Sequence, residues 1–417
     1  MSADVRLIAP SEFSDWLHAN LIGFLAPPKL TEDDVAVRAK STDFTRVQGA
    51  FDGLTGRCVA TFRSFAQELT VPGGAAVSSA AVSNVAVLAT HRRQGLLSRM
   101  MRAELDAAQA RGDVLSTLIA AEYPIYGRYG YGPASSLVEW EIDVPRAGLD
   151  PRWSAPECGG RLDLAEAAEV REFGPVLHDR IRARTAGVVS RQQRAWDLAT
   201  GVERPSYRPY KEQLFVVYRD PLGQIDGYAA YRVDEQWTDD KRPLNTLQVN
   251  DLLAVGPRAE RALWQYLCSI DWVIKVRTGY RAPDDILVDL LPDPRAARPV
   301  TVADSLWVRL LDVVRALGAR TYEVPGTLVL EVTDRMGLAD GRYRLAAAAD
   351  GTAVCERTEE PADLRLDVSE LGSLYLGEAS AVRLAALGRI AEERPGAVAR
   401  ADRMFRTARR PWCPDIF

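Results

Sequence analysis

Within residues 82–121 the pattern of hydrophobic residues changes from that of a strand to that of a helix and back again. Residues 82–88 (VSNVAVL) form a valine-rich run, as in a buried strand. From about Gly95 to Arg111, apolar residues recur at steps of three and four, which predicts an amphipathic helix that ends at Gly112. A second apolar run, 114–121 (VLSTLIAA), predicts another strand. Two strands joined through a helix lie parallel with a right-handed crossover, so the segment predicts a β-α-β unit.

Residues 58–87, upstream, are patterned as two long strands separated by Pro72, Gly73 and Gly74. Proline and glycine residues of this kind interrupt strands and form turns. We therefore expect an antiparallel pair joined at this turn.

The same pattern returns later in the chain. A shift of 167 residues sets 85–98 against 252–265, and the apolar positions coincide. The arginine pair of the first copy becomes Ala259 and Glu260 in the second. We interpret this as a second copy of the fold without the first copy's charged loop, although any strand-loop-helix would align about equally well.

Two linker-like stretches divide the chain. They are residues 146–160, and 290–300 (LLPDPRAARPV), which is rich in proline. The expected domains are therefore residues 1–145, 146–300 and 301–417, in keeping with a length at which chains form two or three domains.

The last hundred residues have a different pattern. It predicts a helix over 304–318, then strand-like runs at 326–334, 343–357 and 362–372, with a hairpin turn at Asp350–Gly351. Two alanine-rich helices follow. This is an α+β domain.

Composition narrows the function classes. No run of eighteen apolar residues and no basic leader are present, which predicts a cytoplasmic chain without a membrane span. The formal charge of −5 disfavours nucleic acid as a partner. Five scattered cysteines without a CxxC pair and three histidines predict no metal site. Arginine makes up 47 of the 52 basic residues, so an Arg-Arg pair alone carries little information.

The junction between the first strand and the helix is a candidate phosphate site. The N–H groups at a helix N-terminus bind anions, and Gly95 allows a ligand to approach closely. Arg92 and Arg93 add positive charge. The pattern is short, and an ordinary turn explains it about as well; it is neither a Walker A loop nor a GxGxxG turn.

A run of alternating tyrosine and glycine, YGRYGYG, follows the second strand at residues 126–132. A phenol beside a strand end can donate a proton to a leaving group, which makes Tyr126 a candidate acid. Tyr129 and Tyr131 are expected to pack in the interior.

Together the two motifs resemble those of GNAT-type N-acetyltransferases, and IYGRYGY matches their tyrosine motif. The resemblance narrows to the enhanced intracellular survival (Eis) family. It rests on VAVLATHRRQGLL (85–97), IYGRYGYGPA (125–134), YAAYRVD (228–234), LGSLYLG (371–377) and the C-terminal phenylalanine. It spans nearly the whole chain. It implies an α+β fold of two tandem GNAT domains, the second degenerate, followed by a sterol-carrier-protein-like domain.

The resemblance also implies roles for particular residues. The backbone N–H of Val85 would stabilise the oxyanion, and Tyr126 would be the general acid toward the CoA sulfur. The carboxylate at the end of the chain, on Phe417, would be the base, although a frayed terminus is the ordinary alternative. Acetyl-CoA would be held by Val85, Ala86, Val87, Arg92, Arg93, Gly95, Leu96 and Leu97, without a metal.

An acceptor pocket for polyamine-like substrates should be roomy and acidic. By resemblance Phe24 and Glu32 would line it, and Glu122 is a further candidate. The acids Glu32, Asp33 and Asp34 are explained equally well as a charged helix start.

The expected function is acetylation of primary amines with acetyl-CoA, the acceptors being small molecules such as aminoglycosides, or lysine side chains. A homo-oligomer, hexameric in the family, is implied by the resemblance. The alternatives are a lipid or sterol carrier, and a regulator that binds acyl-CoA without turnover.

Overall fold

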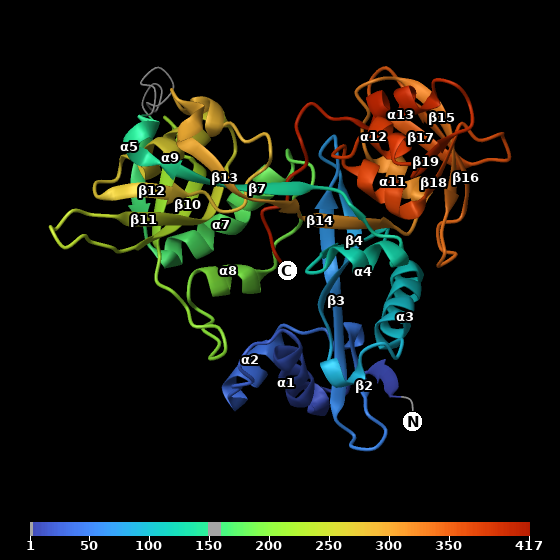
Figure 1. Ribbon diagram of the computed structural model, residues 1–417, viewed down its shortest axis with the longest axis horizontal. Helices are drawn as coiled ribbons and strands as arrows, with labels where there is room; N and C mark the ends of the chain where they lie inside the picture. Colours follow the sequence, from blue (N-terminus) through green and yellow to red (C-terminus); the bar gives the residue numbers. More distant parts are fainter. Residues whose placement is uncertain (1–2, 149–159) are drawn as a thin grey trace.

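The computed structural model describes residues 3–148 and 160–417. It comprises three α+β domains, each built on its own sheet, with the two larger sheets side by side (Figure 1). Most of the linker-like segment 146–160 lies outside the described residues, as does Cys158.

The N-terminal sheet has the order β1-β2-β3-β4-β5-β14-β6. Its strands are β1 (Asp4–Leu7), β2 (Val47–Phe51), β3 (Cys58–Thr70), β4 (Ala76–Val87), β5 (Leu115–Ile119), β14 (Leu306–Leu310) and β6 (Gly132–Pro133). Strands β3 and β4 are antiparallel and β4 and β5 are parallel, so both the predicted hairpin and the predicted β-α-β unit are confirmed.

Helix α3 (Leu96–Arg111) connects β4 to β5, as its apolar period predicted. Its buried face includes Met100, Leu105 and Ala108, each fully buried. Gly112 ends the helix at φ +81°, a left-handed conformation that glycine adopts without a Cβ penalty. Two further helices, α1 (Phe13–Gly23) and α2 (Glu32–Lys40), belong to the same domain.

The central sheet has the order β13-β7-β12-β11-β10-β9-β8. Its strands are β7 (Ser136–Asp143), β8 (Arg161–Ala165), β9 (Leu214–Arg219), β10 (Ile225–Asp234), β11 (Asn245–Ala254), β12 (Val273–Arg277) and β13 (Ala297–Asp304), and its helices include α7 (Ala167–Arg182), α8 (Gln193–Ala199) and α9 (Pro257–Ser269). Strands β11 and β12 are parallel and joined by α9, so the sequence repeat is a structural repeat.

The two larger sheets exchange strands across the expected domain boundaries. Strand β7 precedes residue 146 but pairs in the central sheet, and β14 follows residue 300 but pairs in the N-terminal sheet. The two crossing segments bond to each other where Ser135 N–H donates to Leu306 O and Ser305 N–H to Ser135 O. The N-terminal and central domains are therefore joined by two adjacent crossings of the chain.

The C-terminal domain has a five-stranded sheet. Its elements are β15 (Gly326–Thr333), β16 (Gly341–Ala347), β17 (Ala353–Arg357), β18 (Leu364–Asp367), β19 (Ile390–Glu392), α10 (Val313–Ala319), α11 (Val368–Tyr375), α12 (Ala381–Ala386) and α13 (Ala397–Phe405). The hairpin at Asp350–Gly351 is confirmed by the antiparallel pairing of β16 and β17.

The helix expected over 304–318 is wrong for its first half. Residues Leu306–Leu310 form β14, which lies between β5 and β6 with all five residues buried. The helix, α10, begins after Asp312, whose carboxylate caps it by accepting from Arg315 N–H. Burial on both sides selects the strand, because a five-residue apolar run has no period that distinguishes strand from helix.

Candidate active site

A β-bulge interrupts β4 at Asn84. The flanking pairs are Thr61 with Ala86 and Arg63 with Ser83, so β4 has one more residue than β3 between them. Asn84 lies at φ +54°, in the left-handed region that asparagine tolerates better than most residues. An asparagine within a valine-rich strand was the available sequence signal for this bulge, and the sequence analysis missed it.

Side-chain hydrogen bonds hold the bulge in place. The carbonyl oxygen of Asn84 accepts from Thr61 Oγ1 at 2.8 Å and from Asn20 Nδ2 at 3.2 Å. Asn84 Nδ2 donates in return to Asn20 Oδ1 at 3.2 Å. Since Asn20 is on α1, this helix fixes the conformation of β4.

Beyond the bulge, β4 separates from β5. The parallel pairing runs from Ser79–Leu115 to Val82–Leu118 and stops there, although β4 continues to Val87. The edge of β4 that contains Val85 therefore faces a cavity instead of a neighbouring strand.

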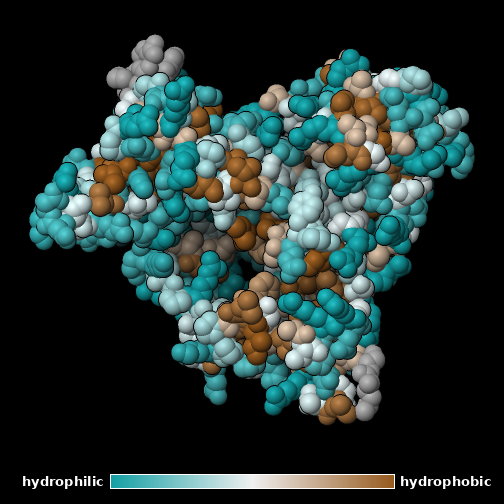
Figure 2. Space-filling view, viewed as in Figure 1, coloured by the Kyte–Doolittle hydropathy of each residue, from teal (hydrophilic) through white to brown (hydrophobic). Residues whose placement is uncertain are grey.

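That cavity, of about 690 Å³, lies between the N-terminal and central domains and receives the C-terminus. Its wall includes residues from α1, β3, β4, α8 and the chain end. In Figure 1 the terminal segment, in red, passes between the central domain and β3, and Figure 2 shows the same face hollowed near its centre. The cavity brings together Phe24, Val85, Tyr126 and Phe417 of the predicted site residues.

The predicted phosphate loop connects β4 to α3. Arg93 (φ +63°) and Gly95 (φ +73°) both have left-handed backbone. Gly95 is the N-cap residue of α3 and has no side chain with which to bond the first N–H groups of the helix. A Cβ at Gly95 would contact nothing within 4 Å, so the space beside it is open. The first N–H groups of α3 consequently remain available to an anion, and the alternation of backbone conformations is typical of anion-binding nests.

The side chains of this loop differ in exposure. Arg92, Arg93 and Gly95 are exposed, Leu97 is half-buried, and Leu96 is a core residue. Leu96 can therefore contribute to ligand binding through its backbone. His91, in the same loop, bonds with Asp52 Oδ2 at 3.2 Å and is not part of the cavity wall.

Three tyrosines of the aromatic-glycine run have different environments. Tyr129 OH bonds to Ser98 at 2.9 Å and Tyr131 OH bonds to Ser116 at 2.6 Å, so both pack in the interior as expected. The Tyr126 hydroxyl has no hydrogen-bond partner among the residues described, and Tyr126 lines the cavity. Burial, and then the nearby carboxylate of Glu122, raise the pKa of Tyr126 to about 12.

The C-terminal tail is docked. Trp412 packs in a core cluster of the central domain, and its backbone N–H donates to Ala186 O at 2.9 Å. A Cβ on Gly187 (φ +94°) would overlap the Trp412 backbone, so glycine is required for this approach. At the end of the chain, the Phe417 ring lies edge-on to Phe65, with 5.6 Å between centroids.

A buried ion pair holds the tail. Arg191 Nε donates to Asp415 Oδ1 at 2.6 Å, and His178 Nε2 is 3.4 Å from the other carboxylate oxygen. Burial opposes ionisation of Asp415, yet the charge of Arg191 and the neighbouring His178 keep its pKa below the usual value.

The wall of the cavity is basic, whereas an acidic acceptor pocket was expected. Its wall contains five arginines and one aspartate besides the terminal residue: Arg38, Arg63, Arg191, Arg194, Arg208 and Asp415. Neither Glu32 nor Glu122 is among the lining residues, and both are exposed. The acids at the start of α2 belong to its cap, where Thr31 and Asp34 exchange hydrogen bonds.

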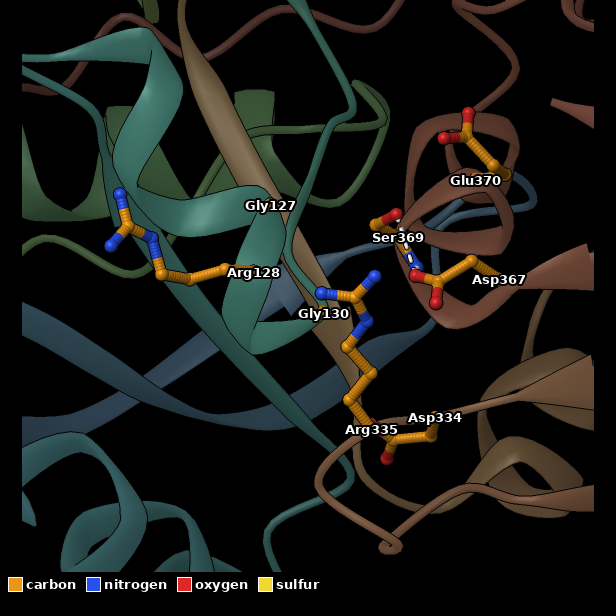
Figure 3. Close-up of a pocket in the computed structure, with 8 residues that line it drawn as sticks. All are labelled: Gly127, Arg128, Gly130, Asp334, Arg335, Asp367, Ser369 and Glu370. Atoms are coloured by element: carbon orange, nitrogen blue, oxygen red, sulfur yellow. Dashed lines mark hydrogen bonds between the residues drawn. The ribbon is translucent and has the colours of Figure 1, made fainter. Parts of the chain in front are cut away.

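A second, polar cleft lies between the N-terminal and C-terminal domains (Figure 3). Figure 3 shows Arg335 reaching toward Gly130, while Ser369 donates to Asp367. Two residues that line this cleft also contact the fully buried Arg309. Asp334 pairs with Arg309 at 2.7 Å, and a Cβ on Gly130 (φ +82°) would overlap the Arg309 side chain. These contacts join two domains, and the cleft contains none of the predicted site residues.

Comparison with known proteins agrees with this architecture. Two acetyltransferase (GNAT) domain models match residues 4–134 and 187–310, and a sterol carrier protein domain model matches 313–414. N-acetyltransferase Eis of Mycobacterium tuberculosis is 37% identical over 353 residues, which cover 81% of this chain and 80% of Eis. The chain belongs to the Eis family of GNAT-type N-acetyltransferases.

Other relatives are more similar in sequence or cover more of the chain. An uncharacterised N-acetyltransferase of Streptomyces avermitilis is 59% identical over 99% of this chain and 98% of its own. The crystal structure of Eis1 from Mycobacterium abscessus superposes with a TM-score of 0.85 at 31% identity, covering 99% of this chain and 100% of Eis1. The predicted fold of two GNAT domains and a sterol-carrier-like domain is therefore confirmed.

None of the helices among the described residues is long and apolar enough to span a membrane. Residues 3–148 and 160–417 contain no group of three or more His, Cys, Asp or Glu side chains arranged to hold a metal ion.

Proposed function

We propose that this N-acetyltransferase uses acetyl-CoA to acetylate a primary amine in the cavity between its N-terminal and central domains. The observation that carries the proposal is the convergence of the separated edge of β4, Tyr126 and the end of the chain on one cavity. Attack of the amine nitrogen on the acetyl carbon breaks the carbon–sulfur bond, so the amine loses a proton and the CoA thiolate gains one.

The donor fits this end of the N-terminal sheet. On the edge of β4 that faces away from β3, residues Val85, Ala86 and Val87 have no partner strand, so backbone groups on this edge are available to the amides of pantetheine. The pyrophosphate would bind the N–H groups of Gly95, Leu96 and Leu97, with Arg92 and Arg93 supplying charge. Acetyl-CoA supplies the activated acetyl group, and the chain positions it.

The proposed oxyanion donor is the N–H of Val85, and the proposed general acid is Tyr126. With its pKa raised to about 12, Tyr126 is protonated at neutral pH and can donate a proton. Its hydroxyl has no partner among the residues described and is free to donate to the sulfur.

The proposed base is the terminal carboxylate of Phe417. A free α-carboxylate has a pKa of about 3.3–3.7, so at neutral pH it is ionised and ready to accept a proton, directly or through water. Docking of Trp412 and Asp415 supports this role because it fixes the terminal residue in the cavity.

The resemblance gives two acceptor classes, aminoglycosides and lysine side chains, and a homo-oligomer, hexameric in related proteins, that works on the cytoplasmic acetyl-CoA pool. The test is thiol release from acetyl-CoA with a panel of aminoglycosides, lysine peptides and small amines, with light scattering for the oligomer. Turnover with any amine supports the proposal. Silence across the panel, with lipid extracted from the purified protein, would favour the carrier function instead.

A further inference from the structure

Two buried arginines in the wall of the cavity have no counter-ion among the residues that the structure describes. Arg38, on α2, is 8% exposed, and Arg63, on β3, is 6% exposed. Both line the cavity. Neither side chain makes a hydrogen bond or an ion pair within 4.0 Å with any residue the structure describes; Arg63 lies over the Phe65 ring, 4.9 Å from its centroid.

The other buried arginines that the structure describes have partners within the protein. Arg191 (with Asp251 and Asp415), Arg281 (with Glu260 and Asp285) and Arg309 (with Asp334) pair with carboxylates, and Arg320 donates to the backbone oxygens of Tyr375 and Phe405. A buried cation without such a partner is unfavourable. Arg38 and Arg63 therefore differ from the arginines that serve the fold.

The two arginines form a cluster with Arg194. Burial, and then the charges of Arg63 and Arg194, lower the pKa of Arg38 to about 9. Burial and Arg194 lower the pKa of Arg63 to about 10. Glu203 is bound to Arg194 at 2.5 Å, which leaves one ion-paired carboxylate for three guanidinium groups. The cluster has an excess of positive charge that only an anion can balance.

The terminal carboxylate is the nearest internal candidate, because Phe417 contacts the same Phe65 ring. No ion pair within 4.0 Å joins it to Arg38 or Arg63 among the described contacts. Its proposed role as base would also be weakened by a direct guanidinium pair, since an opposite charge lowers the pKa of a carboxyl further. The missing anion is therefore assigned to a ligand.

We propose that Arg38 and Arg63 bind an anionic group of the acceptor, a carboxylate or a phosphate, and so select an amine that carries a negative charge over a polycationic one. Guanidinium groups bind both anions in a bidentate manner. The inference rests on the proposed function, and the anionic group takes no part in acetyl transfer. It would orient the amine toward the cavity wall formed by Val85, Tyr126 and Phe417.

The test uses paired acceptors that differ in charge: glucosamine with glucosamine 6-phosphate, and cadaverine with lysine. We expect kcat/KM for thiol release to be at least about tenfold higher for the member of each pair that carries a phosphate or a carboxylate. Arg38→Gln and Arg63→Gln should each reduce that preference toward one. Arg57→Gln, an exposed arginine without a side-chain hydrogen bond among the described contacts, is the control and should keep it.

Two further measurements separate the outcomes. Calorimetric binding of glucosamine 6-phosphate, lost in Arg38→Gln, would support the anion site even if no amine were acetylated, in which case the proposed function fails alone. Equal or better use of the uncharged or cationic acceptors by the wild type would overturn the inference. The inference would also be overturned if Arg38→Gln weakened the binding of acetyl-CoA and left the acceptor preference intact, because the arginines would then bind the donor.

Folding of the variants is checked by thermal unfolding. Removal of an uncompensated buried cation is expected to leave Tm unchanged or raised. If the glutamine variants do not fold, Arg38→Lys and Arg63→Lys keep the charge without the bidentate geometry and should lower the preference partly; an unchanged preference in both would contradict the inference.

Discussion

The N-terminal and central domains contain the same backbone device with opposite outcomes. In each, a strand pairs with its parallel neighbour over four residue pairs and then separates, β4 after Val82 and β11 after Gln248. Each separated strand is bulged, β4 at Asn84 and β11 at Asn250. In the first domain the separated edge faces the cavity of about 690 Å³, whereas in the second a buried ion-pair network lies beside the separated edge and bonds to it.

The filling of the central domain is an ion-pair network around Arg281. Its Nη1 donates to Leu252 O at 2.7 Å, and its other nitrogens bind Asp285 at 2.7 Å and Glu260 at 3.0 Å. Counted from the two bulges, Leu252 occupies the position that Ala86 has in the first domain. A carbonyl group on the edge that would face pantetheine is therefore already occupied in the central domain.

The connections after the separated strands also differ. Eight residues, 88–95, lead from β4 to α3, but two, Val255 and Gly256, lead from β11 to α9. Gly256 is extended at φ −165°, whereas Gly95 is left-handed. Strand separation alone is therefore not enough for the proposed donor site. The site also needs a loop long enough to wrap a phosphate and an opening that the protein's own side chains leave free.

Loss of the acid should have the largest effect. Tyr126→Phe is expected to lower kcat for thiol release by about 10²–10⁴-fold, the usual contribution of a general acid. The matched control is Tyr280→Phe, a half-exposed tyrosine after the parallel strand of the central domain. Equal losses in the two variants would remove the distinction between the domains.

Release of the tail should come next. Asp415→Asn breaks the buried pair with Arg191 and is expected to lower kcat by roughly 10²-fold or less, because the terminal carboxylate is displaced. The pKa of Asp415 is lowered, so its stabilising contribution is present above the ordinary pKa of 3.8 and is lost as pH falls through the lowered value. Hydrogen exchange should show a tail equally protected from pH 5 to 8 in the wild type and exposed in the variant.

Backbone strain introduced into the predicted phosphate loop should reduce activity less than loss of the acid or release of the tail. Gly95→Ala places a Cβ on left-handed backbone, at about 1–2 kcal/mol, and should raise KM for acetyl-CoA about tenfold. Gly256→Ala in the central domain has ordinary extended backbone and open space around its Cβ, so steady-state kinetics should be unaffected. An unchanged KM in Gly95→Ala would argue against a donor site at this loop.

The smallest effect is expected in the filled opening. Glu260→Gln should change acetyl transfer less than about twofold, because Glu260 does not line the cavity in which we propose the chemistry. Burial and Asp285 raise the pKa of Glu260, so its contribution to stability is full below the ordinary pKa of 4.5 and is lost as pH rises through the raised value. The Tm of Glu260→Gln relative to wild type should therefore be higher at pH 8 than at pH 5; no difference between the two would show that Glu260 is not the titrating group.

The sequence predicted the local parts of this molecule well. Period and turn residues were enough for β4, α3, β5 and the repeat, because these elements depend on neighbouring residues. The exchange of β7 and β14 between sheets was not predictable, since it depends on pairing between residues far apart in the chain, such as Ile142 with Ala297 and Ile119 with Leu306, which carry no local signal. The unpaired Arg38 and Arg63 were hidden for another reason: among 47 arginines, nothing in the sequence distinguishes those that lack a carboxylate partner.

The most direct test of the central claim, that the open N-terminal cavity catalyses with the chain's own terminus, is thiol release from acetyl-CoA by three proteins. They are the wild type, a variant without Phe417, and a variant with one glycine added after Phe417, which keeps the ring but moves the carboxylate by about 3.5 Å. We predict that both variants bind acetyl-CoA normally and lose turnover. Turnover that persists in both would contradict a catalytic role for the terminal carboxylate.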